Sequence, residues 1–161
     1  MKREFYVICD NIRSLENIGS IFRTADALDV SKIYLCGISG QPPNHKISKT
    51  ALGAEKTIPF EYCRQIGRLI DKLKRDRISI VALEQDKKAI EYTKLRSRFP
   101  LALIVGNEVR GISPKILNKC DKIIYLPMSG QKESLNVSVA FGIAGYEIIK
   151  NLPTSRQVKN I

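Results

Sequence analysis

The sequence predicts an α/β fold in which helices cover both faces of a mostly parallel sheet. Two observations support this prediction. Strand-like and helix-like segments alternate along the 161 residues, as they do where a helix connects two parallel strands. Several of the strand-like segments are apolar throughout, which is typical of strands buried on both faces. The length suits one domain over residues 1–161, and no internal repeat or linker divides it.

The first third of the chain opens with a predicted strand, helix and strand. Residues 4–9 (EFYVIC) are apolar and rich in β-forming side chains. Residues 17–30 then place apolar side chains at helical spacing, and Asn17 stands where an N-cap is expected. Residues 31–37 are a second apolar, strand-like segment, which ends at a glycine.

The middle of the chain continues the same alternation. A loop rich in turn-forming residues contains a short helix near residues 48–55, and strand-like residues 57–62 follow. Residues 63–77 are predicted as an amphipathic helix and residues 78–84 as a nearly continuous apolar strand. Residues 86–100 are polar and basic, and we expect them to be partly helical or looped.

The last third completes the sheet and ends in a helix. Residues 101–108 are predicted as a buried strand that runs into a loop, and residues 113–120 as a short helix capped by its first serine. A strand over residues 122–128 and a helix over residues 134–152 follow. Residues 153–161 have the composition of a basic tail.

The composition argues against a membrane protein and against a metal site. No stretch approaches the ~18 consecutive apolar residues of a membrane span, and the first residues lack the apolar core of a signal peptide. We therefore expect a cytoplasmic protein. The four cysteines are 27, 27 and 57 residues apart, and the single histidine, His45, lies in a predicted loop. A structural zinc site requires four clustered Cys or His ligands, so we expect no metal.

The charge of the chain favours a polyanionic partner. The formal net charge is +11, from 27 basic and 16 acidic residues, and such an excess most often serves nucleic-acid binding. Basic runs at residues 72–77, 86–88 and 94–98 form the candidate contact surface. A surface that only keeps the protein soluble would give the same charge, and the charge alone assigns no chemistry.

The motifs of common nucleotide enzymes are missing. No G-x-G-x-x-G follows the first predicted strand, and no G-x-x-x-x-G-K-[ST] occurs anywhere. The pair Gly106 and Gly111 is a weak signal by itself, and His45 lacks an obvious nucleophile partner. A nucleotide-dependent enzyme of another class, such as a dehydrogenase, is therefore disfavoured.

Three patches of polar residues and glycines follow apolar strands. They are residues Asn11–Arg23, Gly106–Gly111 and Pro127–Asn136. Each has a purely structural explanation: tight turns for the glycines, helix capping for Glu108, and a carboxylate partner for Arg23. Ligands of open α/β sheets bind outside the carboxyl ends of the strands, so the coincidence of three such patches predicts a binding site there.

The same patches resemble a known family. The segments NIGSIFRTADAL, LALIVGNEVRGIS and IYLPMSGQKESLNVSVAFGIAGYE are similar, in this order, to the three motifs of SpoU/TrmH-type RNA 2′-O-ribose methyltransferases of the SPOUT superfamily. The resemblance covers nearly the whole chain. It implies transfer of a methyl group from S-adenosylmethionine to a ribose 2′-OH of RNA, with tRNA the first candidate and rRNA the second. It also implies a homodimer, no metal, and a deep C-terminal trefoil knot, a feature too rare for composition to suggest.

The resemblance also implies roles for individual residues. Arg23 matches the catalytic arginine; a guanidinium is a poor base, so we expect it to stabilise charge on the attacking oxygen, and the general base stays unassigned. Asn17 would orient Arg23 or its neighbours, and Glu108 would hold the loops or the arginine in place. Ser134 and Asn136 would face cofactor and RNA. The cofactor-binding residues implied are Leu83, Gly106, Asn107, Leu126, Met128 and Leu135.

Two further expectations concern the alternatives and the partners. A non-catalytic RNA-binding protein with the same fold is the main alternative, and the intact motif residues argue against it. Many family members carry an extra N-terminal RNA-binding domain, whereas the first strand here is predicted from residue 4, so the catalytic domain, its dimer partner or another protein would recognise the RNA. The helix over residues 134–152 is apolar most of the way round, which indicates either deep burial or an interface. The resemblance favours an interface for part of its surface.

Overall fold

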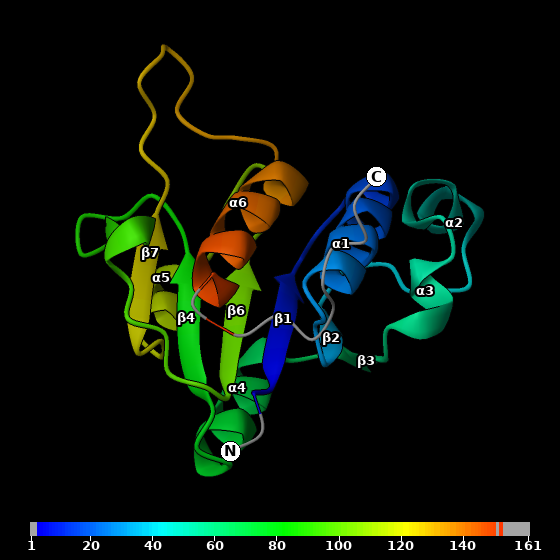
Figure 1. The fold of residues 1–161 in the computed structure, drawn as a ribbon, viewed down its shortest axis with the longest axis horizontal. Coiled ribbons are helices and arrows are strands. Elements are labelled where there is room, and N and C mark those ends of the chain that lie inside the picture. Colours follow the sequence, from blue (N-terminus) through cyan, green and yellow to red (C-terminus); the bar gives the residue numbers. More distant parts are fainter. Residues whose placement is uncertain (1–2, 151, 153–161) are drawn as a thin grey trace.

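A computed structural model describes residues 3–150 and 152, and it contains a parallel sheet covered by helices on both faces (Figure 1). The described residues form seven strands in the order β3-β2-β1-β6-β4-β7-β5, and every neighbouring pair is parallel. The predicted α/β class is therefore confirmed, whereas the knotted path of the chain stays a prediction. The strands are β1 (Phe5–Asp10), β2 (Lys32–Cys36), β3 (Phe60–Cys63), β4 (Ser79–Leu83), β5 (Ile90–Glu91), β6 (Leu101–Val105) and β7 (Lys122–Tyr125).

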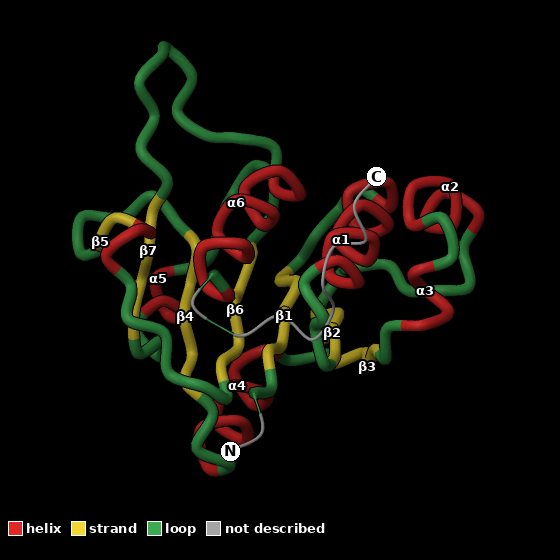
Figure 2. Tube along the Cα trace, in the orientation of Figure 1, coloured by secondary structure: helices red, strands yellow, loops and turns green. Residues whose placement is uncertain are grey.

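Helices occupy both sides of the sheet, as Figure 2 shows. They are α1 (Leu15–Ala27), α2 (His45–Ala51), α3 (Ala54–Thr57), α4 (Ile66–Arg75), α5 (Pro114–Leu117) and α6 (Val137–Ile149), with a short 3₁₀ helix over Tyr92–Lys94. One core lies between the sheet and α1, α2 and α6, and a second lies between the sheet and α4 and α5. None of these described helices is long and apolar enough to cross a bilayer.

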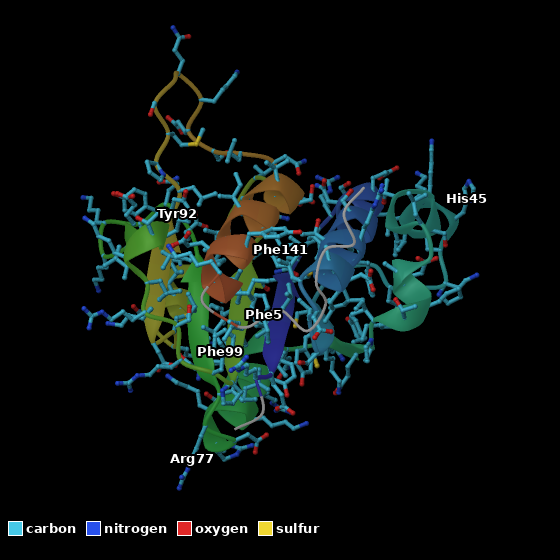
Figure 3. The ribbon with its side chains drawn as sticks, in the orientation of Figure 1. Phe5, His45, Arg77, Tyr92, Phe99 and Phe141 are labelled. Atoms are coloured by element: carbon cyan, nitrogen blue, oxygen red, sulfur yellow. The ribbon has the colours of Figure 1, made fainter. Side chains whose placement is uncertain are left out.

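The two cores explain why the strands are apolar throughout. In β1, Val7 and Cys9 point into the first core and Ile8 points into the second, because successive side chains of a strand face opposite sides of the sheet. All three side chains are fully buried. Phe141 of α6 and Phe5 of β1 belong to the first core, where Figure 3 labels them.

Helix α1 begins three residues earlier than the predicted N-cap implies. Its N-cap is Ser14, whose hydroxyl accepts a hydrogen bond from the backbone N–H of Asn17 at 3.1 Å. The prediction of Asn17 as N-cap is therefore wrong. Ser and Asn are both good caps, and here the serine takes that role, which leaves the Asn17 side chain available for contacts outside the helix.

Helix α6 begins later than predicted. Asn136 is its N-cap and accepts from the backbone N–H groups of Ser138 and Val139, at 2.9 and 3.3 Å. Ser134 and Leu135 therefore belong to the preceding loop, which extends beyond the carboxyl edge of the sheet (Figure 1). The helix also ends at Ile149, before the predicted end at Leu152.

Two other segments differ from the sequence prediction. The short helix expected near residues 48–55 is two helices, α2 and α3, separated by Leu52 and Gly53 in left-handed conformations. His45, expected in a loop, is the exposed first residue of α2. Residues 86–100 contain the two-residue strand β5, which is too short to leave a periodic signal. The predicted tail over residues 153–161 lies outside the described residues.

Candidate functional site

A cavity of about 230 Å³ lies at the carboxyl edge of the sheet, between the ends of β4, β6 and β7 and the start of α6. This is the edge at which the sequence predicted a ligand site. Its wall includes every residue that was expected to contact the cofactor: Leu83, Gly106, Asn107, Leu126, Met128 and Leu135. Of the five expected catalytic residues, Glu108, Ser134 and Asn136 also line it. The structure thus brings nine predicted residues to one cavity, and their roles stay predictions.

Gly106 permits the tight fold of the loop that closes one side of the cavity. A Cβ atom at Gly106 would lie 2.6 Å from Cγ1 of Ile112 and 2.8 Å from the carbonyl carbon of Gly111. The loop returns toward β6 here, and the N–H of Gly111 donates to the carbonyl of Asn107 at 2.9 Å. The structural explanation that the sequence offered for this glycine, a tight turn, therefore agrees with the packing of the loop.

Asn107 organises the same loop with both ends of its amide. Its Nδ2 donates to the carbonyl oxygen of Asn11 at 2.8 Å. Its Oδ1 accepts from the backbone N–H groups of Val109 and Arg110, at 3.0 and 2.9 Å. The side chain therefore fixes the loop after β6 to the end of β1. These contacts hold Asn107 in the wall of the cavity.

The Glu108 carboxylate joins this loop to the start of α1. It accepts from the backbone N–H groups of Arg13 and Ser14, each at 3.0 Å, and from Nδ2 of Asn17 at 3.2 Å. Partial burial raises the pKa of Glu108, but these hydrogen bonds to the charged form outweigh it and hold the pKa below its usual value. The carboxylate is therefore ionised at neutral pH, at a helix N-terminus that favours negative charge.

Asn17 and Asn136 extend this connection to α6. Nδ2 of Asn136 donates to Oδ1 of Asn17 at 3.1 Å, while Nδ2 of Asn17 donates to Glu108. One chain of side-chain hydrogen bonds therefore runs from the N-cap of α6 through the first turn of α1 to the 106–111 loop. The three polar patches predicted from sequence meet in this chain, which we call the amide network (Asn136, Asn17 and Glu108).

Arg23 and Ser134 stand apart from this network. Arg23 is exposed on α1, makes no hydrogen bond or ion pair with another described residue, and does not line the cavity. It lies six residues beyond Asn17, which is about 9 Å along a helix. Of the two roles that the resemblance offered for Glu108, its hydrogen bonds fit the holding of loops, and none of them is to Arg23. Ser134 is exposed in the loop before α6 and lines the cavity.

Sequence reasoning missed two polar residues of the cavity wall. Glu84 accepts from the backbone N–H groups of Ile112 and Gln85, at 2.8 and 2.9 Å, and Gln85 donates through Nε2 to the carbonyl of Leu126 at 2.8 Å. These contacts fix the end of β4 to the loop after β6 and to the end of β7. The signal that could have identified Glu84 is a carboxylate directly after an apolar strand.

The charge of the cavity wall is opposite to that of the whole chain. Its ionisable groups include Glu84 and Glu108, and the described residues that line it include no Lys, Arg or His. Apolar side chains make up much of the remaining wall. Such a site favours a cationic ligand with an apolar part and disfavours a pyrophosphate. Elsewhere among the described residues, no group of three or more His, Cys, Asp and Glu could hold a metal ion.

Comparisons with known proteins agree with one family. The sequence model of the SpoU rRNA Methylase family matches residues 4–146. YacO of Bacillus subtilis (strain 168), whose name assigns it to the TrmH family of tRNA/rRNA methyltransferases, is 31% identical over 149 residues, which are 92% of this chain and 59% of YacO. The chain thus spans about three fifths of the length of this curated relative.

Solved structures give the same result. The A. aeolicus TrmH/SpoU tRNA modifying enzyme is 32% identical and superimposes with a TM-score of 0.84, over 92% of this chain and 75% of that chain. The SpoU methyltransferase AviRb from Streptomyces viridochromogenes, in complex with AdoMet, is 26% identical with a TM-score of 0.85, over 93% of this chain and 61% of that chain.

Proposed function

We propose, from the premise that this chain belongs to the SpoU rRNA methylase family, that it transfers a methyl group from S-adenosylmethionine to a ribose 2′-OH of RNA. The observation that carries the proposal is the wall of the carboxyl-edge cavity. It combines apolar side chains with Glu84 and Glu108 and has no cationic side chain among the described residues that line it. S-adenosylmethionine is a sulfonium cation with an apolar adenine face. The carboxylates of the wall suit its charge, and the apolar side chains suit its adenine.

The residues that would hold the cofactor follow from their place in the wall. Leu83, Leu126 and Leu135 offer apolar surface to the adenine, and Glu84 and Glu108 give the cavity the negative charge that suits a sulfonium. When bound, the cofactor supplies an electrophilic methyl group, which needs no metal. A ligand with a pyrophosphate would meet like charge here, which argues against the dehydrogenase alternative.

The chain's own part in the reaction is to position the RNA and stabilise charge. The 2′-oxygen gains the methyl group, the methyl–sulfur bond breaks, and the hydroxyl proton leaves to an acceptor that we do not assign. A guanidinium is a poor base, so we assign Arg23 to the charge that develops on the 2′-oxygen. The amide network holds the loops around the cavity in one arrangement.

We also propose that the protein is a homodimer. Val139, Ile143 and Tyr146 of α6 are 51%, 40% and 56% exposed, and spacings of four and three residues put them on one helix face. An exposed apolar stripe supports an interface, and a second copy would meet it with the same stripe about a two-fold axis. Sedimentation at micromolar protein should give a dimer for the wild type and a monomer for Val139→Glu.

The direct test of the function is methyl transfer to RNA. The protein is incubated with S-adenosylmethionine labelled in the methyl group and with separate tRNA and rRNA fractions, and the product is digested with alkali. We expect label in alkali-resistant dinucleotides, because a 2′-O-methyl group blocks hydrolysis at that position, and we expect it first in tRNA. Label in free nucleotides would indicate base methylation and contradict the proposed position. Cofactor and RNA binding without transfer would instead support the non-catalytic alternative.

A further inference from the structure

The amino edge of the sheet carries a second hollow, opposite the reaction cavity. This groove of about 720 Å³ lies where β4, β6 and β7 begin, and the end of α4 and the segment before β6 complete it. Ser79 and Leu101 pair in register at its floor. Five basic residues line it: Lys74, Arg77, Arg96, Arg98 and Lys122. We call it the basic groove.

Four of these cations have no partner among the residues that the structure describes. Arg77, Arg96, Arg98 and Lys122 are exposed, and none makes an ion pair or side-chain hydrogen bond with another described residue. Lys74 is different, because its Nζ lies 3.2 Å from Oδ1 of Asp121 and donates to the carbonyl of Lys119 at 2.7 Å.

The one carboxylate among the described lining residues is therefore already occupied. Asp121 pairs with Lys74 and also accepts from the backbone N–H of Ile80 at 2.8 Å. Among the described residues, the groove therefore has four cations that no carboxylate pairs with, and this excess of positive charge attracts an anion.

A helix end does not explain this cluster. Cations near the C-terminus of α4, such as Lys72 and Arg75, interact favourably with the helix dipole. Arg96 and Arg98 lie instead in the segment after the 3₁₀ helix, and Lys122 is the first residue of β7. Three chain segments, distant in sequence, bring their cations to the same groove.

The backbone at Arg77 gives a second, independent observation. Arg77 follows the C-cap of α4 with φ at 61°, in the left-handed region. Its N–H donates to the carbonyl of Lys74 at 2.9 Å, and the N–H of Ile78 donates to that of Leu73 at 3.0 Å. This is the position at which helices favour glycine, so the fold itself gains nothing from an arginine there. The side chain extends into solvent at this edge (Figure 3).

We infer that the basic groove binds the sugar–phosphate backbone of the RNA substrate, away from the reacting nucleotide. The inference rests on the proposed function for the identity of the polyanion. Ser79 lines the groove and Leu83 lines the cavity, and four residues of a strand span about 13 Å. One RNA therefore reaches both edges of the sheet. Contacts to phosphates fix its position without reading its sequence.

The test removes charge without disturbing the fold. Arg77→Gly removes one cation and suits the local backbone, so its melting temperature should equal or exceed that of the wild type. The triple variant Arg77→Gly, Arg96→Gln, Arg98→Gln removes three. Two matched controls exist: Lys56→Ala removes an exposed cation from α3, and Leu52→Gly relaxes a left-handed residue with φ at 51° and leaves the charge unchanged.

RNA affinity is measured by fluorescence anisotropy, with single-stranded polyuridine of about 15 nucleotides and with tRNA, across about 50 to 200 mM potassium chloride. We expect the triple variant to bind on the order of tenfold to hundredfold more weakly at the lowest salt. The slope of log affinity against log salt concentration changes by about 0.7 for each phosphate contact with a single strand. The loss of three contacts should therefore make this slope shallower by about two. Both controls should match the wild type, and cofactor affinity should not change.

The outcomes separate this inference from the proposed function. A salt slope and an affinity equal to those of the wild type would overturn the inference and leave methyl transfer standing. Reduced RNA affinity in a protein that transfers no methyl group would support the groove and contradict the proposed function. If the protein transfers methyl groups and the basic groove binds RNA, the triple variant raises KM for RNA and leaves kcat unchanged. Polyglutamate that competes as well as RNA would overturn the assignment to RNA and indicate an acidic protein partner.

Discussion

The two edges of the sheet use polar side chains in opposite ways. At the carboxyl edge, Asn136, Asn17 and Glu108 are bound to one another and to backbone N–H groups. At the amino edge, Arg77 and Arg98 point to solvent with no partner among the described residues. The chain has a net charge of +11, yet the described wall of the carboxyl-edge cavity has two carboxylates and no cation.

This difference suggests two tasks: the carboxyl edge selects a ligand by its shape, and the amino edge attracts a ligand by its charge. Side chains held by several hydrogen bonds stay in one geometry, so they can favour one ligand shape or one transition state. Exposed cations on long side chains act mainly through summed charge, and salt weakens them. We therefore expect changes at the carboxyl edge to alter cofactor binding or the rate of chemistry, and changes at the amino edge to alter RNA affinity.

Replacing Arg23 should have the largest effect, which falls on the rate of methyl transfer. Arg23 is also an exception to the comparison of the two edges. Like those of the basic groove, it is an exposed cation with no partner in the described part of the chain, yet we assign it to chemistry. Arg23→Ala should reduce the single-turnover rate at saturating RNA on the order of 10²–10³-fold. Cofactor affinity should barely change, because Arg23 does not line the cavity. A wild-type rate in this variant, measured with Arg98→Ala as the matched control, would remove Arg23 from the mechanism.

The next largest effect is expected at Leu135, where a change in the charge of the cavity should weaken cofactor binding. Leu135→Lys places a cation in a wall that contains Glu84 and Glu108, and we expect S-adenosylmethionine to bind at least about tenfold more weakly, or about 1.4 kcal/mol. The neutral thioether S-adenosylhomocysteine should lose less affinity, and Leu135→Met should lose little of either. Calorimetric titration of both ligands measures this. Equal losses for the two would show that bulk, and not charge, excludes the ligand.

These two variants together test where Arg23 acts. Arg23 does not line the cavity of its own chain, so we expect it to serve the second copy of the proposed dimer. The rate is measured at a cofactor concentration that fills the wild-type cavity and leaves the Leu135→Lys cavity largely empty. Mixing Arg23→Ala protein with Leu135→Lys protein should then restore about a quarter of the wild-type rate, since half of randomly formed dimers are mixed and each has one intact site. No recovery after subunit exchange would place Arg23 and the cavity of one reaction in the same copy.

Asn17 gives a smaller effect, which falls on stability. Asn17→Ala removes two side-chain hydrogen bonds of the amide network and should lower the free energy of unfolding by about 1–2 kcal/mol. Arg98→Ala at the amino edge should change it by less than about 0.5 kcal/mol. Chemical denaturation of both variants measures the difference. Equal effects would show that the amide network contributes no more to stability than an unpaired surface cation.

The sequence was sufficient for the fold class and for the location of the cavity. Parallel strands buried on both faces must be apolar throughout. Three consecutive apolar residues, Val7, Ile8 and Cys9, are therefore enough to indicate such a strand. Polar loops that follow such strands meet at one edge because the strands are parallel. Element ends were less accurate, because Ser14 and Asn17 are both good caps. Only the folded chain shows that the Ser14 hydroxyl accepts from the Asn17 N–H, while the Asn17 side chain donates to Glu108.

The basic groove could not be predicted as a unit. Arg77, Arg98 and Lys122 are distant in the sequence, and only the strand order brings β4, β6 and β7 together there. The sequence marked residues 72–77 and 94–98 as separate basic runs of equal weight. It could not show that Lys74 is paired with Asp121 and that its neighbours in the groove are not.

The smallest expected effect is a pH dependence at the carboxyl edge, where two carboxylates behave oppositely. Asp10, the last residue of β1, is 5% exposed, and burial raises its pKa above the usual value. A raised carboxyl pKa means that the folded state binds the proton more tightly, so the free energy of unfolding falls as pH rises above about 3.8. Glu108, whose hydrogen bonds hold its pKa below the usual value, adds stability above about pH 4.5 that is lost on acidification.

The two isosteric variants should therefore change stability in opposite directions. Asp10→Asn should raise the melting temperature at pH 7, and Glu108→Gln should lower it. The Asp10 difference should shrink as the pH falls toward about 3.8, because the wild-type carboxyl group is then protonated in the folded protein. The Glu108 difference should begin to shrink only below about pH 4.5, where the unfolded chain takes up the proton before the folded protein does. Differential scanning calorimetry at pH 7 and pH 4 measures both. A lower melting temperature for Asp10→Asn at pH 7 would show that a compensating charge, such as the nearby Arg13, stabilises the Asp10 carboxylate more than burial destabilises it.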